Sequence, residues 1–207
     1  MEYIIAREGW PFIGVALALF IISIVLGFWV PIFVTGALLI FVIYFFRNPE
    51  RVVPNGKDLL ISPADGRVIK VEKGENGGTL VSIFMSVLNV HVNRIPLDGV
   101  VKKIEYNKGR FLVASRDKAS LDNEQNAITI EDSFGRIVKF VQIAGLVARR
   151  IVCYLKEGDR VRMGERFGMI RFGSRLDVYM PAEFTPLVKE GMKVKSGATI
   201  LGKMGGI

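Results

Sequence analysis

The N-terminal part of the chain is one long apolar block. From Gly9 to Phe46, 38 consecutive residues include no Asp, Glu, Lys, Arg or His. A single α-helix of this length would run about 57 Å, nearly twice the roughly 30 Å hydrocarbon core of a membrane. Gly27 and Pro31, near the middle of the block, favour a turn. The pattern therefore predicts two short apolar helices, residues 10–27 and 29–46, that form a membrane hairpin.

The charges beside the block predict its orientation. Both ends of a hairpin lie on one side of the membrane, and Arg47, Arg51 and Lys57 closely follow the second helix. Because positive charge next to membrane spans favours the cytoplasmic side, we expect the rest of the chain on the cytoplasmic face of the cell membrane. A helix pair that lies in the interface without crossing is the alternative. A cleaved signal peptide fits less well, since no small-residue cleavage site follows Phe46.

Beyond Phe46 the hydrophobic pattern changes to short alternating runs separated by turn residues. Such runs are typical of strands joined by tight turns. A glycine cluster at 74–78 lacks the frame of a phosphate-binding loop and predicts a hairpin turn. The length of this part suits one domain with its own core, so we expect two domains, 1–46 and 47–207. The expected strands are 68–71, 79–84, 100–106, 127–131, 137–143 and 151–155.

Two ten-residue segments near the C-terminus repeat one pattern. Residues 155–164 and 188–197 share the frame apolar-Lys-Glu-Gly-x-x-Val-x-x-Gly. Each copy predicts a tight turn at its first glycine, a short strand at its valine, and a second turn. This arrangement resembles the paired turns of biotinyl- and lipoyl-like barrel-sandwich domains. The expected fold class is therefore mainly β, a barrel-sandwich-hybrid-like domain preceded by the α-helical hairpin, although such a fold does not fix a function.

Charge and composition exclude several classes of protein. The chain holds 28 Lys and Arg against 20 Asp and Glu, a net charge of +8, and the part beyond Phe46 carries +9. Beside a membrane anchor, this charge favours anionic lipid surfaces as partners. Its cations are scattered and no nucleic-acid module is recognisable, so nucleic acid is not an expected partner. With one cysteine, Cys153, and one histidine, His91, the chain can form neither an internal disulfide framework nor a Cys/His zinc site.

Three short segments contain the residues that could carry chemistry. Taken singly, each has a simple structural explanation. Asp65 and the glycine after it suit a β-turn, His91 could be a satisfied buried histidine, and the pair Gly173-Ser174 lacks the nucleophile-elbow frame. His91 is also the one side chain expected to exchange protons near pH 7. The segments are 61–68 (ISPADGRV), 84–96 (FMSVLNVHVNRIP) and 171–178 (RFGSRLDV).

Together, in this order and behind an apolar hairpin, the segments resemble those of the phosphatidylserine decarboxylase proenzymes of the short, membrane-anchored type. The resemblance implies that the chain cuts itself, without hydrolysis, between Gly173 and Ser174. Ser174 would become an N-terminal pyruvoyl group, which serves as the cofactor in place of a metal or pyridoxal phosphate. The products would be a β chain, residues 1–173, and an α chain, residues 174–207. Gly173 suits this step because it has no Cβ and tolerates a strained backbone.

The resemblance also implies a reaction and a set of roles. The pyruvoyl group would form a Schiff base with the serine amine of the lipid and accept the electrons released with carbon dioxide, giving phosphatidylethanolamine. His91 is the expected acid for the proton that replaces the carboxylate. Asp65 matches the aspartate of the self-cleavage triad in the family. Arg94, Arg67 and Arg175 are candidates, by charge alone, for binding the lipid phosphate or carboxylate.

One departure from the family affects the triad. Longer relatives have two histidines three residues apart, and their triad uses the second; here His91 matches the first and Arg94 stands at the second position. Either His91 serves both self-cleavage and decarboxylation, or Asp65 and Ser174 complete cleavage with other help. The junction also reads FGSR where the longer relatives have LGST, which leaves Arg175 without an assigned role.

Three other functions remain compatible with the sequence. The first is the same chemistry on another serine lipid, such as an archaeal ether lipid. The second is a membrane-tethered carrier or binding module without chemistry, for which Lys193 in the second repeat copy is the nearest candidate carrier lysine. The third is an inactive relative that stays uncleaved, against which the intact Ser174 and His91 argue. The expected partners are the serine phospholipid, the membrane and the two chains of the proenzyme, and a homo-oligomer is also compatible.

Overall fold

The computed structural model describes residues 4–74, 76–109, 123–145, 150–171 and 174–205. The chain forms two compact units, Met1–Glu50 and Arg51–Ile207. The expected domain limit after residue 46 lies four residues before the limit between these units. Gly173 lies outside the described residues, so the predicted cleavage site is described only on its Ser174 side.

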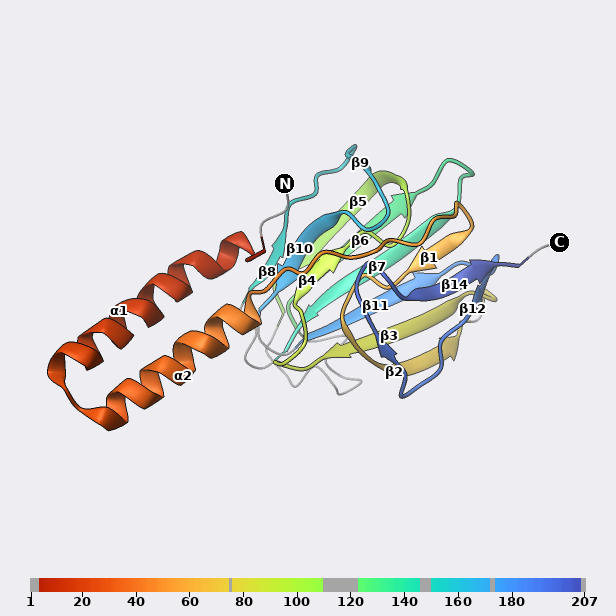
Figure 1. The fold of residues 1–207 in the computed structure, drawn as a ribbon. Coiled ribbons are helices and arrows are strands. Elements are labelled where there is room, and N and C mark those ends of the chain that lie inside the picture. The colour runs from red at the N-terminus through yellow and green to blue at the C-terminus, as the bar shows by residue number, and fades with distance from the viewer. Residues whose placement is uncertain (1–3, 75, 110–122, 146–149, 172–173, 206–207) are drawn as a thin grey trace. The chain divides into compact units, whose positions relative to one another are not determined.

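The first unit is a pair of antiparallel helices, α1 (Trp10–Leu26) and α2 (Trp29–Phe45), preceded by a 3₁₀ turn at Arg7–Gly9 (Figure 1). Gly27 ends α1 in the left-handed region, with φ of 73°, a conformation that glycine adopts without steric cost. Pro31 lies in the first turn of α2, where its missing N–H breaks no helical hydrogen bond. The predicted helical hairpin is therefore confirmed.

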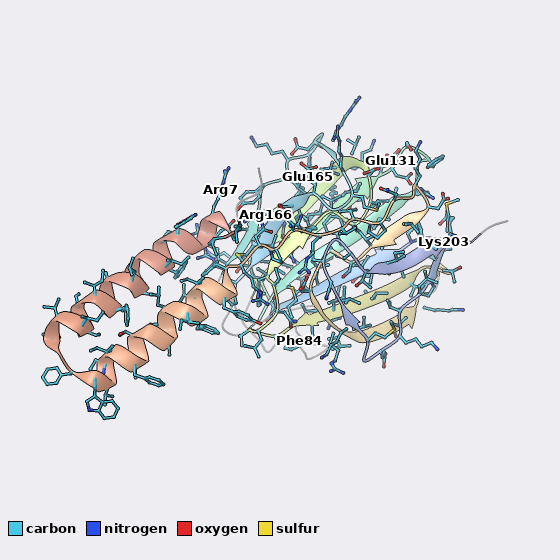
Figure 2. The ribbon with its side chains drawn as sticks, in the orientation of Figure 1. Arg7, Phe84, Glu131, Glu165, Arg166 and Lys203 are labelled. Carbon is cyan, nitrogen blue, oxygen red and sulfur yellow. The ribbon has the colours of Figure 1, made fainter. Side chains whose placement is uncertain are left out.

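The surface of the helix pair is apolar. Side chains such as Val25, Trp29 and Phe33 are 75–81% exposed, and Figure 2 shows side chains that project outward along both helices. Between the helices, the Thr35 hydroxyl donates to the Ser23 hydroxyl at 3.2 Å. The segment Arg7–Leu26 is long and apolar enough to cross a membrane, whereas α2 is slightly shorter. Such an exposed apolar surface indicates contact with lipid or another apolar partner.

The second unit is mainly β, as predicted, and each of the six predicted strands has a counterpart in it. Its strands pair antiparallel into three sheets, with the orders β13-β2-β3-β11-β7-β6-β5-β9, β1-β14-β12 and β4-β10-β8. Among the described residues, the sheets stay open and do not close into a barrel. The strands are β1 (Leu59–Ile61), β2 (Gly66–Lys73), β3 (Thr79–Met85), β4 (Val92–Arg94), β5 (Gly99–Asn107), β6 (Gln125–Glu131), β7 (Ile137–Ala144), β8 (Ile151–Cys153), β9 (Arg160–Val161), β10 (Arg166–Ile170), β11 (Ser174–Met180), β12 (Phe184–Pro186), β13 (Lys193–Val194) and β14 (Ile200–Met204).

The two repeat copies form the expected turn–strand–turn units. Gly158 and Gly164 flank β9, Gly191 and Gly197 flank β13, and all four glycines have φ between 75° and 91°. The spacing of 33 residues also separates the starts of β1 and β4, of β2 and β5, and of β8 and β12. The large sheet follows the same symmetry, since β13 pairs with β2 at one edge and β9 with β5 at the other. The second unit is thus built from two similar halves.

The hydrophobic core lies against one face of the large sheet. Alternation along β11 directs Leu176 and Val178 into the core beside Ile83 of β3 and Phe140 of β7. The Phe140 ring also meets Phe167 of β10 edge-on, with ring centres 5.1 Å apart. Arg175 and Asp177 alternate with these residues and therefore lie on the opposite face of the sheet.

Glycines at the starts of β2 and β5 allow strands to approach closely. A Cβ on Gly66 would overlap the carbonyl oxygen of Phe84, and one on Gly99 would overlap that of Glu131. We expect Gly66→Ala to lower the free energy of unfolding by about 3 kcal/mol, because backbone rather than a flexible side chain would have to move. Thermal unfolding in detergent measures the effect. Gly74→Ala is the control, since its Cβ would have only an ordinary contact; equal melting temperatures for the two variants would contradict the prediction.

Candidate active site

Ser174 is the first residue of β11, a central strand of the large sheet, and therefore lies at one end of that strand. It is opposite Met85, the last residue of β3, and Ala144, the last residue of β7. The residue is fully buried, and its hydroxyl has no hydrogen-bond partner among the described residues. Leaving a buried hydroxyl unsatisfied costs about 1–3 kcal/mol, so the position calls for a chemical explanation.

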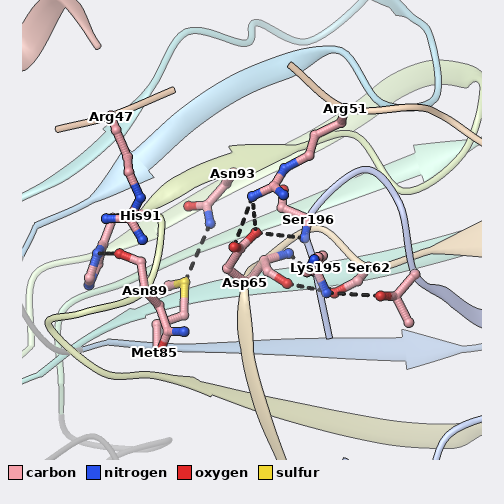
Figure 3. A network of polar contacts seen from close by, with 12 residues as sticks. Arg47, Arg51, Ser62, Asp65, Met85, Asn89, His91, Asn93, Lys195 and Ser196 are labelled. Atoms are coloured by element: carbon pink, nitrogen blue, oxygen red, sulfur yellow. Dashed lines mark hydrogen bonds and ion pairs between the residues drawn. The ribbon is translucent and has the colours of Figure 1, made fainter. Parts of the chain in front are cut away.

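His91 is buried in the segment between β3 and β4, with its ring held by the local backbone. Its Nδ1 lies 2.9 Å from the carbonyl oxygen of Asn89 (Figure 3). A carbonyl oxygen can only accept, so Nδ1 carries the hydrogen and the lone pair of a neutral ring lies on Nε2. The Asn89 side chain in turn accepts hydrogen bonds from the Ser86 N–H and hydroxyl at 2.9 and 2.8 Å. The turn thus fixes the tautomer and the orientation of the imidazole.

Asp65 joins the start of β2 to the second repeat copy. It accepts hydrogen bonds from the Ser196 N–H at 2.8 Å and from Arg51 Nη2 at 3.0 and 2.9 Å (Figure 3). Asp98 occupies the matching position in the other half and accepts from the Met163 N–H at 2.6 Å. Holding a repeat turn is therefore common to both aspartates, and Asp65 in addition binds an arginine.

Of the three candidate arginines, Arg94 is buried and contacts turns of both repeat copies. Its Nη1 donates to the carbonyl oxygen of Gly164 at 2.9 Å, and its aliphatic stem packs against Gly197. The residue that replaces the second histidine of longer relatives therefore connects a turn of the first repeat copy to a turn of the second. This contact gives Arg94 a structural role, whatever it contributes to the substrate.

Arg175 is also buried, on the face of the sheet opposite the core. Its Nε and Nη2 donate to Asp177 at 2.6 and 2.9 Å, and Nη2 also donates to the Ser82 hydroxyl at 2.9 Å. Both charged side chains are 3% exposed or less. This guanidinium is engaged in a bidentate buried ion pair, a geometry typical of structural arginines.

Arg67, in contrast, is exposed and lines a cavity of about 550 Å³. The cavity brings Asp65 and Asn89 together with Arg67 and two lysines from the second repeat copy. Arg67 lies opposite Phe84, and Phe84 lies opposite Arg175, the residue after Ser174. Two strand spacings, about 10 Å, therefore separate the backbone of Arg67 from the start of β11. The full lining is Asp65, Gly66, Arg67, Phe84, Ser86, Asn89, Lys193, Val194 and Lys195.

The structure adds residues that the sequence did not single out. Arg51, predicted only as a flanking charge, is the partner of Asp65. A chain of buried amides also passes beside β11, where Gln142 lies opposite Leu176: Asn126 donates to Gln142 at 3.0 Å, and Gln142 donates to Asn93 at 2.9 Å. Asn93 lies within the 84–96 segment, and Gln142 interrupts the apolar core face of β7. These two positions are the only signs of the amide chain in the sequence, because its hydrogen bonds join strands that are far apart in the chain.

Cys153 is not set up as a nucleophile. Burial raises the pKa of its thiol above the ordinary value, and hydrogen bonds from the Leu155 backbone and the Asn126 side chain only partly oppose the effect. The thiol therefore stays protonated near pH 7, and the thiolate is the reactive form.

Comparison with known proteins identifies the family. A sequence model of phosphatidylserine decarboxylase matches residues 38–202. Proteins named phosphatidylserine decarboxylase proenzyme are 52% identical in Syntrophus aciditrophicus (96% of each chain covered), 47% identical in Cupriavidus metallidurans (96% of this chain, 94% of the relative) and 46% identical in Polynucleobacter asymbioticus (99% and 97%). The chain belongs to the phosphatidylserine decarboxylase family. The resemblance and the enzyme class predicted from the three segments are confirmed, and a carrier without chemistry is not favoured.

The buried ion pair of Arg175 gives a prediction that separates structure from substrate binding. In a Ser174→Ala background, we expect Arg175→Met to destabilise the protein by about 3–5 kcal/mol, because it leaves the Asp177 carboxylate buried and unpaired. Arg175→Met combined with Asp177→Leu should recover most of that loss. Denaturant unfolding monitored by circular dichroism measures both variants. Equal instability of the single and double variants would argue against the ion pair as the cause.

Proposed function

We propose that this protein is a self-processing, pyruvoyl-dependent enzyme that decarboxylates phosphatidylserine to phosphatidylethanolamine in phospholipid biosynthesis. The observation that carries the proposal is the buried hydroxyl of Ser174, which has no partner among the described residues and stands at the position where the family resemblance implies self-cleavage. Ser174 also fits the expected cofactor, because the pyruvoyl group would be made from a serine at this position.

In the proposed self-cleavage, Ser174 Oγ bonds to the carbonyl carbon of Gly173 as the peptide C–N bond breaks, which gives an ester. β-Elimination then removes the Cα proton of residue 174 and breaks its Cβ–Oγ bond. This step releases residues 1–173 with a free carboxylate and leaves a dehydroalanine, which tautomerises to an imine. Water replaces the amino nitrogen of residue 174, and the nitrogen leaves as ammonia. A neutral His91 offers its Nε2 lone pair for the hydroxyl proton, because Nδ1 is committed to the Asn89 carbonyl.

The pyruvoyl group, once formed, supplies the electron sink for loss of carbon dioxide. The chain's own residues bind the substrate and move protons around that group. We assign His91, in its protonated form, the proton that replaces the carboxylate. We assign Arg67 the lipid phosphate, since it lines the same cavity as Asn89, whose carbonyl oxygen holds the His91 ring. Asp65 is a positioning residue that acts through Arg51 and the Ser196 turn.

Strand pairing provides a reason for the two chains to stay together after cleavage. In the proposed α chain, residues 174–207, β11 lies between β3 and β7 of the β chain. From the same α chain, β13 pairs with β2, and β14 pairs with β1. Each repeat copy belongs to a different chain. Dissociation would therefore open the large sheet at its centre and expose the core.

We further propose that the helical hairpin anchors the enzyme in the cell membrane, with the second unit on the cytoplasmic face. The support is the apolar segment Arg7–Leu26 and the basic residues that follow α2. The hairpin has both ends on one side, so the positive charge that follows it favours the cytoplasm.

Self-cleavage is tested first by intact mass. We expect the purified wild-type protein to give two species, residues 1–173 and residues 174–207, the smaller one blocked by a pyruvoyl group. Ser174→Ala removes the nucleophile and should give one uncut chain of 23.0 kDa. A folded wild-type protein that stays uncut would rule out the proposal.

The role of His91 is tested by separating cleavage from turnover. We expect His91→Gln to lower kcat by about 10²-fold or more in whatever fraction of the protein is cleaved, because proton transfer contributes on that scale. Mass spectrometry gives the cleaved fraction, and release of labelled carbon dioxide gives turnover. Val138→Ala, which removes buried core methyl groups away from the cavity lining, is the control for a general loss of packing. If His91→Gln turns over as fast as the wild type per cleaved molecule, His91 has no role in decarboxylation.

A further inference from the structure

A short turn with an apolar tip forms part of the rim of the 550 Å³ cavity. Ser86 and Asn89 line the cavity, and the two residues between them, Val87 and Leu88, are 41% and 60% exposed. The turn is closed, because the Ser86 N–H and hydroxyl donate to the Asn89 side chain and the Asn89 N–H donates to the Ser86 carbonyl. The turn directly after β3 is thus closed by hydrogen bonds and exposes two apolar side chains to solvent.

Three cations line the same cavity. Arg67, Lys193 and Lys195 are all exposed. Asp65 is the one carboxylate among the described residues that line the cavity, and it is paired with Arg51. Lys193 lies opposite Arg67 on neighbouring strands. Like charges placed opposite each other in a sheet are unfavourable. The Arg67 guanidinium donates to the Gly191 carbonyl at 3.1 Å, and an anion bound by both cations would offset their remaining repulsion.

The combination of an apolar tip and exposed cations fits one class of partner. Residues at a membrane interface bury apolar side chains at the boundary of headgroups and acyl chains, while neighbouring cations contact anionic headgroups. The lipid substrate must also pass from a bilayer to the buried Ser174. A membrane surface seated on the cavity rim would bring the lipid headgroup to the cavity without removing its tails from an apolar environment.

We propose that Val87 and Leu88, together with Arg67, Lys193 and Lys195, form a membrane-contact surface, here called the rim surface, that docks on anionic phospholipid. Val87 and Leu88 enter the interface, and the cations bind the headgroup phosphates. The inference deepens the proposed function, on which it rests for the identity of the substrate. The rim surface acts in addition to the hairpin, which anchors the chain but supplies none of these groups.

The first experiment compares two physical forms of one substrate. Full-length Val87→Ser/Leu88→Ser is assayed on phosphatidylserine in mixed phosphatidylserine–phosphatidylcholine vesicles and on a short-chain phosphatidylserine below its micellar concentration. We expect a loss of about tenfold on vesicles, because the apolar contact with the interface is gone, and less than a twofold change on the monomeric lipid. Phe134→Ser is the matched control, since Phe134 is 64% exposed but lies in the turn between β6 and β7.

The cations are tested in the same way. Lys193→Gln/Lys195→Gln should lose activity on vesicles by about tenfold at low salt, with a smaller loss at high salt, since salt screens exposed charges. Lys156→Gln/Lys203→Gln removes the same charge from other exposed positions and should behave like the wild type; Figure 2 labels Lys203 on β14. Equal losses on vesicles and monomeric lipid, for either rim variant, would mean that these residues shape the site and would overturn the proposal.

A second measurement does not depend on activity. Leu88→Cys in a Cys153→Ser, Ser174→Ala background is labelled with a polarity-sensitive thiol fluorophore and reconstituted through its hairpin into vesicles. We expect a blue shift in vesicles that contain phosphatidylserine, a smaller shift in pure phosphatidylcholine, and none for a label at Phe134→Cys.

The fluorescence readout keeps the two proposals distinguishable. A blue shift without any decarboxylase activity in the Ser174-containing protein would sink the proposed function and leave the rim surface standing. No shift at position 88 in either vesicle would overturn the rim surface, even if the enzyme is active. A shift that instead grows with protein concentration in lipid-free detergent would also overturn it, in favour of a contact between copies of the chain.

Discussion

The pairing of β11 with β3 on one side and β7 on the other is the constraint on which the rest of this molecule depends. It fixes Ser174 level with Met85 and Ala144, at the one end of the sheet where the turn carrying His91 begins. It also separates two neighbours in sequence, because alternation turns Ser174 toward the core and Arg175 toward the opposite face. The proposed reactive serine and a buried ion pair can therefore lie next to each other on one strand without sharing an environment.

The β unit is built from two similar halves, and several residues of the proposed site have structural counterparts in the other half. Asp65 and Asp98 perform the same capping task in the two halves, and Gly66 and Gly99 allow the same close approach of strands. In the proposed site, one half carries side chains that the repeat does not require, such as Arg51 beside Asp65. The proposed site thus differs from the matching region of the other half by a few side chains, while the strands and turns around it are shared by both halves.

Local patterns were sufficient to predict what depends on local physics. The helical hairpin followed from the uninterrupted apolar block, the repeat turns from spaced glycines, and the hairpin at 74–78 is closed by the Gly74 N–H on the Gly78 carbonyl. The open sheets, the Asp65–Arg51 pair and the Arg175–Asp177 pair were not predictable, because each depends on which distant strands become neighbours. For Arg175, charge alone indicated a ligand for the substrate, whereas register and burial gave it an internal partner.

The pairing of β14 with β1 brings the end of the chain beside the beginning of the β unit, with Lys203 opposite Leu59. A linker from β14 back to the segment before β1 would thus join parts of the chain next to neighbouring strands, and a gene permuted to begin at residue 174 would encode the same strand pairs. The order of the two segments in the natural gene is dispensable for the sheet. What that order provides is a peptide bond before Ser174, which is the bond that the proposed self-cleavage requires.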